Sequence, residues 1–179
     1  MRDALSGELG ITVPEEPGLS FGLSADDDDA ADPEVSVSSI DAITAFIQFL
    51  ESPPRDHGDE TLEARGEGLF DVVGCAQCHV PNLETQDGTE LHAYTDLLLH
   101  EIAKASDLGI EEGDAGIHEF RTPPLWGLSR TAPYLHDGRA STIEDAIAEH
   151  YGEALMVRGA FEVLSPADQD ALLAFLRSL

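Results

Sequence analysis

The spacing of apolar residues predicts helices in several separate parts of the chain. One helix is expected from Ser38 to the Pro53-Pro54 pair, with apolar residues at Ile40, Ile43, Phe46, Ile47 and Leu50. A C-terminal helix should begin after Ser165, an N-cap candidate, with Pro166 as its first residue. No stretch alternates between apolar and polar residues for long enough to predict a sheet. The pattern therefore indicates an all-α fold.

A further helix is expected between Asp59, a plausible N-cap, and Gly74, which should end it. Its apolar stripe consists of Leu62, Leu69, Phe70 and Val73. Gly66 lies on the same stripe, and the absence of a side chain there would allow a second helix to cross closely.

A fourth helix should begin near the run Ser141-Thr142-Ile143-Glu144, which has the form of a capping box. On this helix Ile143, Ile147 and His150 occupy one face. A lone histidine on an apolar face is more often a hydrogen-bonded core residue than a ligand, so the periodicity alone leaves both interpretations open.

The first 36 residues are rich in Pro, Gly and Asp, and the segment 25–33 contains four consecutive aspartates. Such a composition cannot bury an apolar face, so a loop or a disordered segment is expected. We therefore divide the chain into an N-terminal extension, residues 1–56, with an acidic loop and one helix, and a domain at 57–179.

The only two cysteines belong to the run Cys75-Ala76-Gln77-Cys78-His79. This C-x-x-C-H pattern is typical of the attachment site of one covalent haem c. The two thiols would form thioethers to the vinyl groups of the porphyrin, and the adjacent imidazole would bind the iron. A zinc site or a dithiol redox pair is the alternative, but a structural zinc ion requires four ligands, and only histidines remain to complete the set.

A haem iron bound by His79 has room for a second axial ligand. The candidates are His57, His92, His100, His118, His136, His150, Tyr151, Met1 and Met156. With a haem present, the apolar face that carries His150 would include the porphyrin, so His150 is favoured as the second metal ligand over Met156.

Charge and length limit the possible partners. The 179 residues contain 36 acidic and 9 basic residues, a formal net charge of −27. Nucleic acid is therefore not expected as a partner. The acidity fits either a docking surface for a cationic redox protein or a solvated surface suited to high salt. No membrane span is expected, because no apolar run reaches about 18 residues.

Several ordered motifs resemble the bacterial di-haem cytochrome c peroxidase superfamily, and within it the di-haem oxidoreductase branch, also called thiol-oxidoreductase-like. The matching segments are 9–12, 74–79, 94–100, 120–128, 132–139, 142–146, 152–154 and 175–179. The resemblance implies a cytochrome c-like helical domain with long loops, and it implies that this chain corresponds to the C-terminal half of such a protein. In the peroxidases, that half passes electrons to an N-terminal haem where peroxide is cleaved.

The resemblance also suggests roles for single residues. His150 stands eight residues after Thr142, where the peroxidases have a methionine and one relative a tyrosine. His136 is expected to brace the haem pocket, and Arg121 and Arg139 to meet the propionates, although turns or surface ion pairs would also explain the two arginines. The carbonyl of Pro81 is expected near the imidazole of His79.

Two functions follow as hypotheses. The first is a c-type haem electron-transfer domain, the electron-relay half of a di-haem peroxidase-like oxidoreductase, with an N-terminal haem domain, fused or separate, and a redox partner protein. The second is a haem enzyme with an open distal site that reduces peroxide by itself, assisted by His100, His136 or a carboxylate. The start of the chain lacks the apolar region of a secretory signal, but covalent haem is normally installed outside the cytoplasm. A periplasmic or otherwise extracytoplasmic location is therefore expected, with this chain the later part of a longer exported polypeptide.

Overall fold

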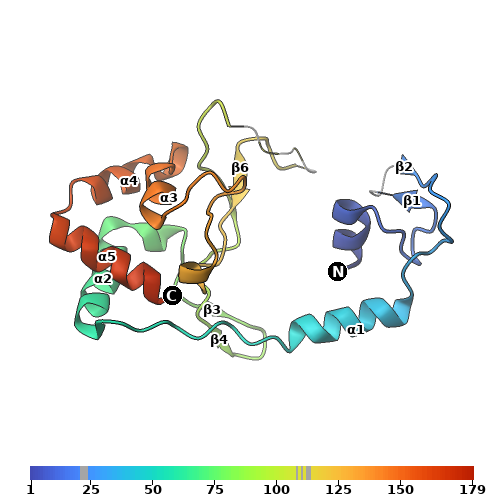
Figure 1. Ribbon diagram of the computed structural model, residues 1–179, viewed down its shortest axis with the longest axis horizontal. Coiled ribbons are helices and arrows are strands. Elements are labelled where there is room, and N and C mark those ends of the chain that lie inside the picture. The colour runs from blue at the N-terminus through green and yellow to red at the C-terminus, as the bar shows by residue number, and fades with distance from the viewer. Residues whose placement is uncertain (21–23, 108, 110, 112–113) are drawn as a thin grey trace. The chain divides into compact units, whose positions relative to one another are not determined.

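The computed structural model describes residues 1–20, 24–107, 109, 111 and 114–179 (Figure 1). These residues form two compact units, Met1–Ser52 and Pro53–Leu179. Each unit has a hydrophobic cluster of its own, built from Leu5, Val13 and Ile40 in the first and from a larger set around Phe70 and Phe175 in the second.

The N-terminal unit contains more regular structure than its composition suggested. A π-helical turn, Ala4–Glu8, is followed by the antiparallel strands β1 (Leu19–Ser20) and β2 (Ser24–Ala25) and by helix α1 (Val37–Gln48). The predicted helix is confirmed, although it begins one residue earlier than expected. Residues 21–23 of the segment expected to be irregular lie outside the described residues.

The acidic segment of this unit is tied to a single buried threonine. The hydroxyl of Thr12 donates to the carboxylate of Asp32 at 2.6 Å, and its backbone N–H donates to Glu34 at 2.8 Å. Thr12 itself is fully buried. Part of the acidic sequence therefore packs against the unit through hydrogen bonds, without contributing an apolar face.

Helices α2 (Glu60–Val73) and α5 (Pro166–Ser178) form the centre of the second unit and cross each other (Figure 1). Their predicted ends are confirmed, because the side chains of Asp59 and Ser165 accept N-terminal N–H bonds and Gly74 ends α2 with a φ of 104°. Gly66 allows the close approach, since a Cβ atom there would lie 2.0 Å from the carbonyl oxygen of Ala171.

Two further helices, α3 (Ile143–Ala148) and α4 (Leu155–Glu162), complete the helical part of this unit. Helix α3 is capped by Thr142, one residue later than the sequence suggested, because the Asp145 carboxylate accepts from the Thr142 N–H and completes the capping box. Short 3-10 helices occupy Cys75–Gln77, Leu128–Arg130 and Gly152–Ala154.

The prediction of an all-α fold was wrong, because the structure is mixed. Besides β1 and β2, the described residues form two antiparallel pairs in the second unit. Strand β3 (Leu83–Glu84) pairs with β4 (Glu90–Leu91), and β5 (Leu99–Glu101) pairs with β6 (Glu119–Arg121). Strands of two or three residues are too short to produce a detectable alternation of apolar and polar positions, which explains why the sequence did not reveal them.

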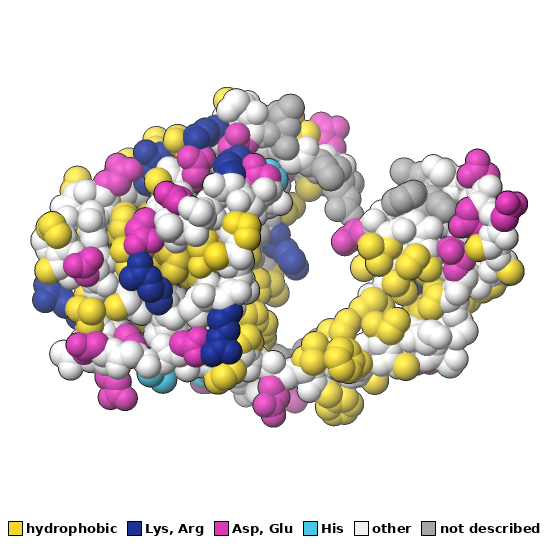
Figure 2. All heavy atoms as spheres, viewed as in Figure 1, with side chains coloured by type: hydrophobic (Ala, Val, Ile, Leu, Met, Phe, Trp, Pro, Cys, Tyr) yellow, Lys and Arg dark blue, Asp and Glu magenta, His cyan; other side chains and the backbone are white. Residues whose placement is uncertain are grey.

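The segment at the start of the second unit lies along the end of α5. Asp56 donates its N–H to the carbonyl of Ser178 at 2.9 Å, and Arg55 donates to the Ser178 hydroxyl. Across the visible face, Asp and Glu side chains are scattered over both units rather than gathered in one patch (Figure 2). Among the described residues, no helix is long and apolar enough to cross a membrane.

Candidate haem site

The C-x-x-C-H motif follows directly on the end of α2. Gly74 reverses the chain in the left-handed region, and the 3-10 helix Cys75–Gln77 then presents both cysteines as free thiols. Burial raises the pKa of Cys75 to about 11 and also raises the pKa of Cys78. Both thiols are therefore protonated at neutral pH, and neither belongs to a disulfide.

His79 is held in one tautomer by a backbone carbonyl. Its Nδ1–H donates to the oxygen of Tyr94 at 3.0 Å, so the lone pair is on Nε2. Burial lowers the pKa of this imidazole to about 4, despite the opposing effect of the Tyr94 hydrogen bond. His79 is half-buried, and a neutral imidazole whose Nδ1–H is held by a carbonyl is the usual form of a histidine that binds a metal.

His150, which follows the motif in the sequence, is held in the same way. It lies two residues beyond the end of α3, and its Nδ1–H donates to the carbonyl of Ala146 at 2.7 Å. Burial lowers the pKa of His150 as well. A positive charge on His150 would also contribute to the lowered pKa of His79. Two imidazoles with free Nε2 atoms, together with the two thiols of the motif, are therefore the groups that could hold a covalently bound haem.

In this structure, two other ligand candidates are poorly suited to bind an iron. His100 uses both ring nitrogens, with Nε2 bonded to Asp96 at 2.8 Å and Nδ1 to Glu153 at 3.0 Å. The hydrogen bond to Glu153 has the larger effect and the one to Asp96 the next, and both raise the pKa of His100. They favour its charged form, which has no free lone pair for a metal. Met156 is 83% exposed on α4.

Three side chains that could bind a metal ion also lie close together, and one of them belongs to the motif. The ligand atoms of Cys78, Asp96 and His100 lie within 4.8 Å of one another. This trio includes neither Cys75 nor His79 and supplies three of the four ligands that a structural zinc ion takes. The spacing of the motif is therefore explained better by the haem than by zinc.

The three remaining predicted site residues line one cavity. Arg121, His136 and Arg139 line a cavity of about 700 Å³. The residues that line it do not include Cys75, Cys78, His79 or His150. The exposed ring of His136 stacks on Phe120 with 4.5 Å between ring centroids. The roles predicted for them beside the porphyrin remain predictions. The contacts of Arg139 in the structure are with carboxylates of this chain, those of Asp107, Asp137 and Glu149.

Sequence reasoning missed the residue that orients His79. Pro81 was expected to supply the carbonyl, whereas Tyr94 supplies it and Pro81 in turn accepts from the Tyr94 N–H at 3.4 Å. Tyr94 adopts a φ of 53°, which is unusual for a residue other than glycine. No local pattern reveals that geometry, although Tyr94 does belong to one of the motifs of the family resemblance.

Comparison with known proteins gives a consistent result. The sequence model described as di-haem oxidoreductase matches residues 18–179. Cytochrome c551 peroxidase of Nitrosomonas europaea is 28% identical over 136 residues, which cover 75% of this chain and 38% of that protein. Cytochrome-c peroxidase IdrP2 of Pseudomonas sp. strain SCT is 33% identical over 177 residues, with coverages of 77% and 47%. The chain thus spans less than half the length of these two relatives.

Solved structures support the fold alone. A MauG-like protein associated with microbial copper homeostasis superposes with a TM-score of 0.54 and is 22% identical in sequence. The match covers 90% of this chain and 61% of that one. The two chains therefore share a fold over most of the length of this chain.

Proposed function

This chain belongs to the di-haem oxidoreductase family, and on that premise we propose that it is the electron-relay half of a peroxidase-like oxidoreductase. It would carry one haem c, attached through Cys75 and Cys78 and bound at the iron by His79 and His150. A haem oxidoreductase is what the family supports directly. The relay role and the single haem are the proposal.

The observation that carries the proposal is the pair of half-buried imidazoles whose Nδ1–H groups are held by backbone carbonyls. The carbonyls of Tyr94 and Ala146 fix the two rings in the tautomer whose Nε2 can bind a metal, and burial keeps them unprotonated. When bound, the haem supplies a one-electron couple at its iron. If His79 and His150 both bound the iron, no ligand position would be left for a peroxide, and the domain would be suited to passing electrons.

The choice of ligands bears on the direction of electron flow. Methionine–histidine ligation raises the reduction potential of a c-type haem, and two histidines lack that effect. We therefore expect a lower potential here than a methionine at position 150 would give. The measurable consequence is that His150→Met should raise the midpoint potential while the haem remains attached.

The location of the site of substrate reduction is proposed from the length of the chain. Because the chain spans less than half of its relatives, the site of substrate reduction is proposed to lie in an N-terminal haem domain, fused or separate. The domains proposed from the sequence, 1–56 and 57–179, place the whole haem site in the second. The net charge of −27 would attract a cationic redox partner, and attachment of a haem would imply an extracytoplasmic location.

An optical spectrum of the haem-loaded chain tests the relay role. A six-coordinate low-spin spectrum is expected for the wild type and for His92→Ala, a control that removes an exposed histidine. His150→Ala should be high-spin and should bind peroxide, which the wild type should not. A high-spin wild type would instead support the enzyme with an open distal site, and a low-spin His150→Ala would show that another residue is the ligand.

A further inference from the structure

The residue before the proposed ligand is held by two cations from distant parts of the chain. The Oε2 atom of Glu149 lies 2.6 Å from Nζ of Lys104 and 3.4 Å from Nε of Arg139. The Glu149 side chain is only 23% exposed, so its charge is partly removed from water. We refer to Lys104, Arg139 and Glu149 as the Glu149 clamp.

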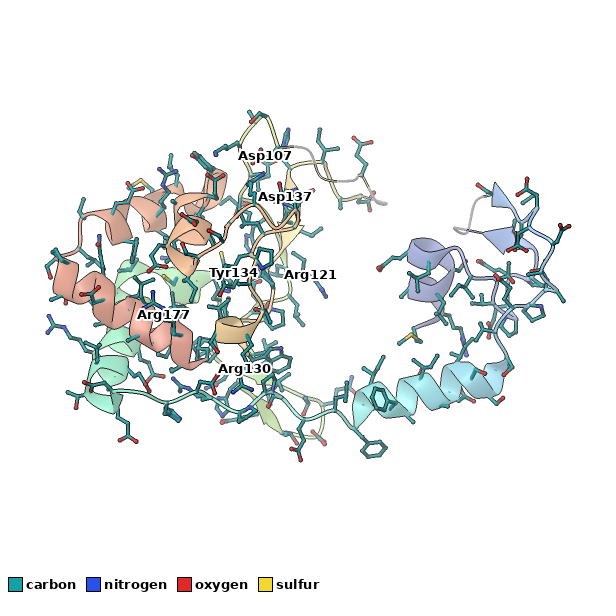
Figure 3. The ribbon with its side chains drawn as sticks, in the orientation of Figure 1. Asp107, Arg121, Arg130, Tyr134, Asp137 and Arg177 are labelled. Carbon is teal, nitrogen blue, oxygen red and sulfur yellow. The ribbon has the colours of Figure 1, made fainter. Side chains whose placement is uncertain are left out.

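Arg139 anchors the clamp to two further carboxylates. Its guanidinium lies 2.6 Å from Asp107 and 3.2 Å from Asp137, and both aspartates are labelled in Figure 3. The planar fork of an arginine can bind several carboxylates at once in a fixed geometry, which a lysine cannot do. Arg139 thereby joins the segment before β6 to the end of α3.

The residue after the proposed ligand is held from the same segment. The N–H of Tyr151 donates to the carbonyl of Ile102 at 2.9 Å. The ring of Tyr151 contacts two cations, with Lys104 4.9 Å and Arg158 4.7 Å from its centroid. Lys104 therefore contacts both neighbours of His150, since it also bonds to Glu149.

These restraints matter because α3 alone does not fix His150. The helix has six residues and ends at Ala148, so His150 lies past the last regular turn, where its N–H bonds to Ile147 at 3.1 Å. Helices this short have little stability of their own, and the position of a residue beyond the end depends on tertiary contacts. The clamp supplies such contacts on one side of His150, and Tyr151 supplies them on the other.

We infer that Arg139 is a positioning residue for the sixth ligand, because through Glu149 it holds the backbone that presents His150 to the iron. This inference rests on the proposed function, in which His150 is that ligand. It assigns Arg139 a role through carboxylates of this chain rather than through a haem propionate. Loss of the clamp should let His150 leave the iron more often without abolishing its binding.

Cyanide binding to the ferric, haem-loaded chain measures that departure, because cyanide can bind only while the sixth position is open. Arg139→Gln should increase the observed binding rate about five- to thirtyfold, the ratio that a loss of 1 to 2 kcal/mol produces. Arg139→Lys keeps the charge without the fork and should give an intermediate rate. Arg177→Gln is the matched control, since it removes an arginine 2.6 Å from Glu144 at the other end of α3.

The outcomes separate the inference from the proposed function. If His150→Ala is high-spin while Arg139→Gln binds cyanide at the same rate as Arg177→Gln, the positioning role is overturned and the ligand assignment stands. If His150→Ala remains low-spin, the ligand assignment fails first. Should Arg139→Gln not fold, Glu149→Gln provides the same test, because it removes the carboxylate that both cations hold, and the same rate increase is expected.

Discussion

The carbonyl oxygen of Tyr94 accepts the Nδ1–H of His79 at 3.0 Å, and the ring of the same tyrosine packs edge-on against Phe70 and Phe175. These phenylalanines come from α2 and α5, the two helices that cross at the centre of the unit. One residue therefore connects the helix crossing to the orientation of the proposed proximal ligand. A hydrogen bond of this kind fixes the tautomer of a metal-binding histidine and increases its basicity.

The helix crossing depends on a glycine, which gives the first prediction. Gly66→Ala would place a Cβ atom 2.0 Å from the Ala171 carbonyl, so we expect the free energy of unfolding to fall by about 1 to 3 kcal/mol or more. Chemical denaturation of the haem-loaded chain measures this change. Gly68→Ala is the control, because open space surrounds that position on the same helix and alanine should be neutral or slightly stabilising there. Equal losses in the two variants would contradict the close crossing.

The cap of α3 gives a second prediction. The hydroxyl of Thr142 accepts the N–H of Asp145 at 3.0 Å, so Thr142→Ala should lower the free energy of unfolding by about 1 kcal/mol. Ser141→Ala should cost less, because the Ser141 hydroxyl only donates to the exposed carboxylate of Asp145. Denaturant titration of both variants distinguishes the two residues. A larger loss in Ser141→Ala would place the cap at Ser141, as the sequence alone suggested.

A third prediction concerns pH. Hydrogen bonds to Glu153 and Asp96 raise the pKa of His100 above its usual 6.5, so folding favours the protonated ring. The resulting stabilisation is complete below the usual pKa and is lost as the pH rises through the raised one. The stability difference between the wild type and His100→Gln, measured by denaturation, should therefore shrink as the pH rises above 6.5. A difference that grows with pH would contradict the two carboxylate contacts.

A matched histidine provides the control for this pH dependence. His92 is exposed, and its ring contacts the neutral amide oxygen of Asn82 instead of a carboxylate. His92→Gln therefore removes a histidine without breaking a bond to a carboxylate, which makes it the matched control for His100→Gln. If both variants behaved alike, the effect would belong to histidine in general and not to the bonds with Asp96 and Glu153.

Features that act over a few neighbouring residues could be predicted from the sequence. Asp59, Gly74 and Ser165 begin or end their helices through hydrogen bonds and backbone angles that extend only two or three positions. The attachment motif is likewise local, because the chemistry requires both thiols and the imidazole within five residues. The close crossing at Gly66 could be foreseen because the glycine lies on an apolar stripe.

Features that join distant segments could not be predicted. The Tyr94 carbonyl reaches His79 across 15 positions, and Lys104 reaches Glu149 across 45, with no periodicity to reveal either contact. The hairpins β3–β4 and β5–β6 escaped notice because their strands are too short to alternate. Arg139 shows the limit of assigning roles by residue type, since the carboxylates around it belong to the chain itself.

The intact mass of the denatured protein tests the central claim most directly. The chain should be produced in a host that attaches haem c, purified, and extracted with acidified organic solvent before the measurement. We predict the mass of the chain plus one haem for the wild type, and the mass of the chain alone for the Cys75→Ser, Cys78→Ser double variant. A wild-type chain that loses its colour to the solvent and shows only the polypeptide mass would contradict covalent attachment at Cys75 and Cys78.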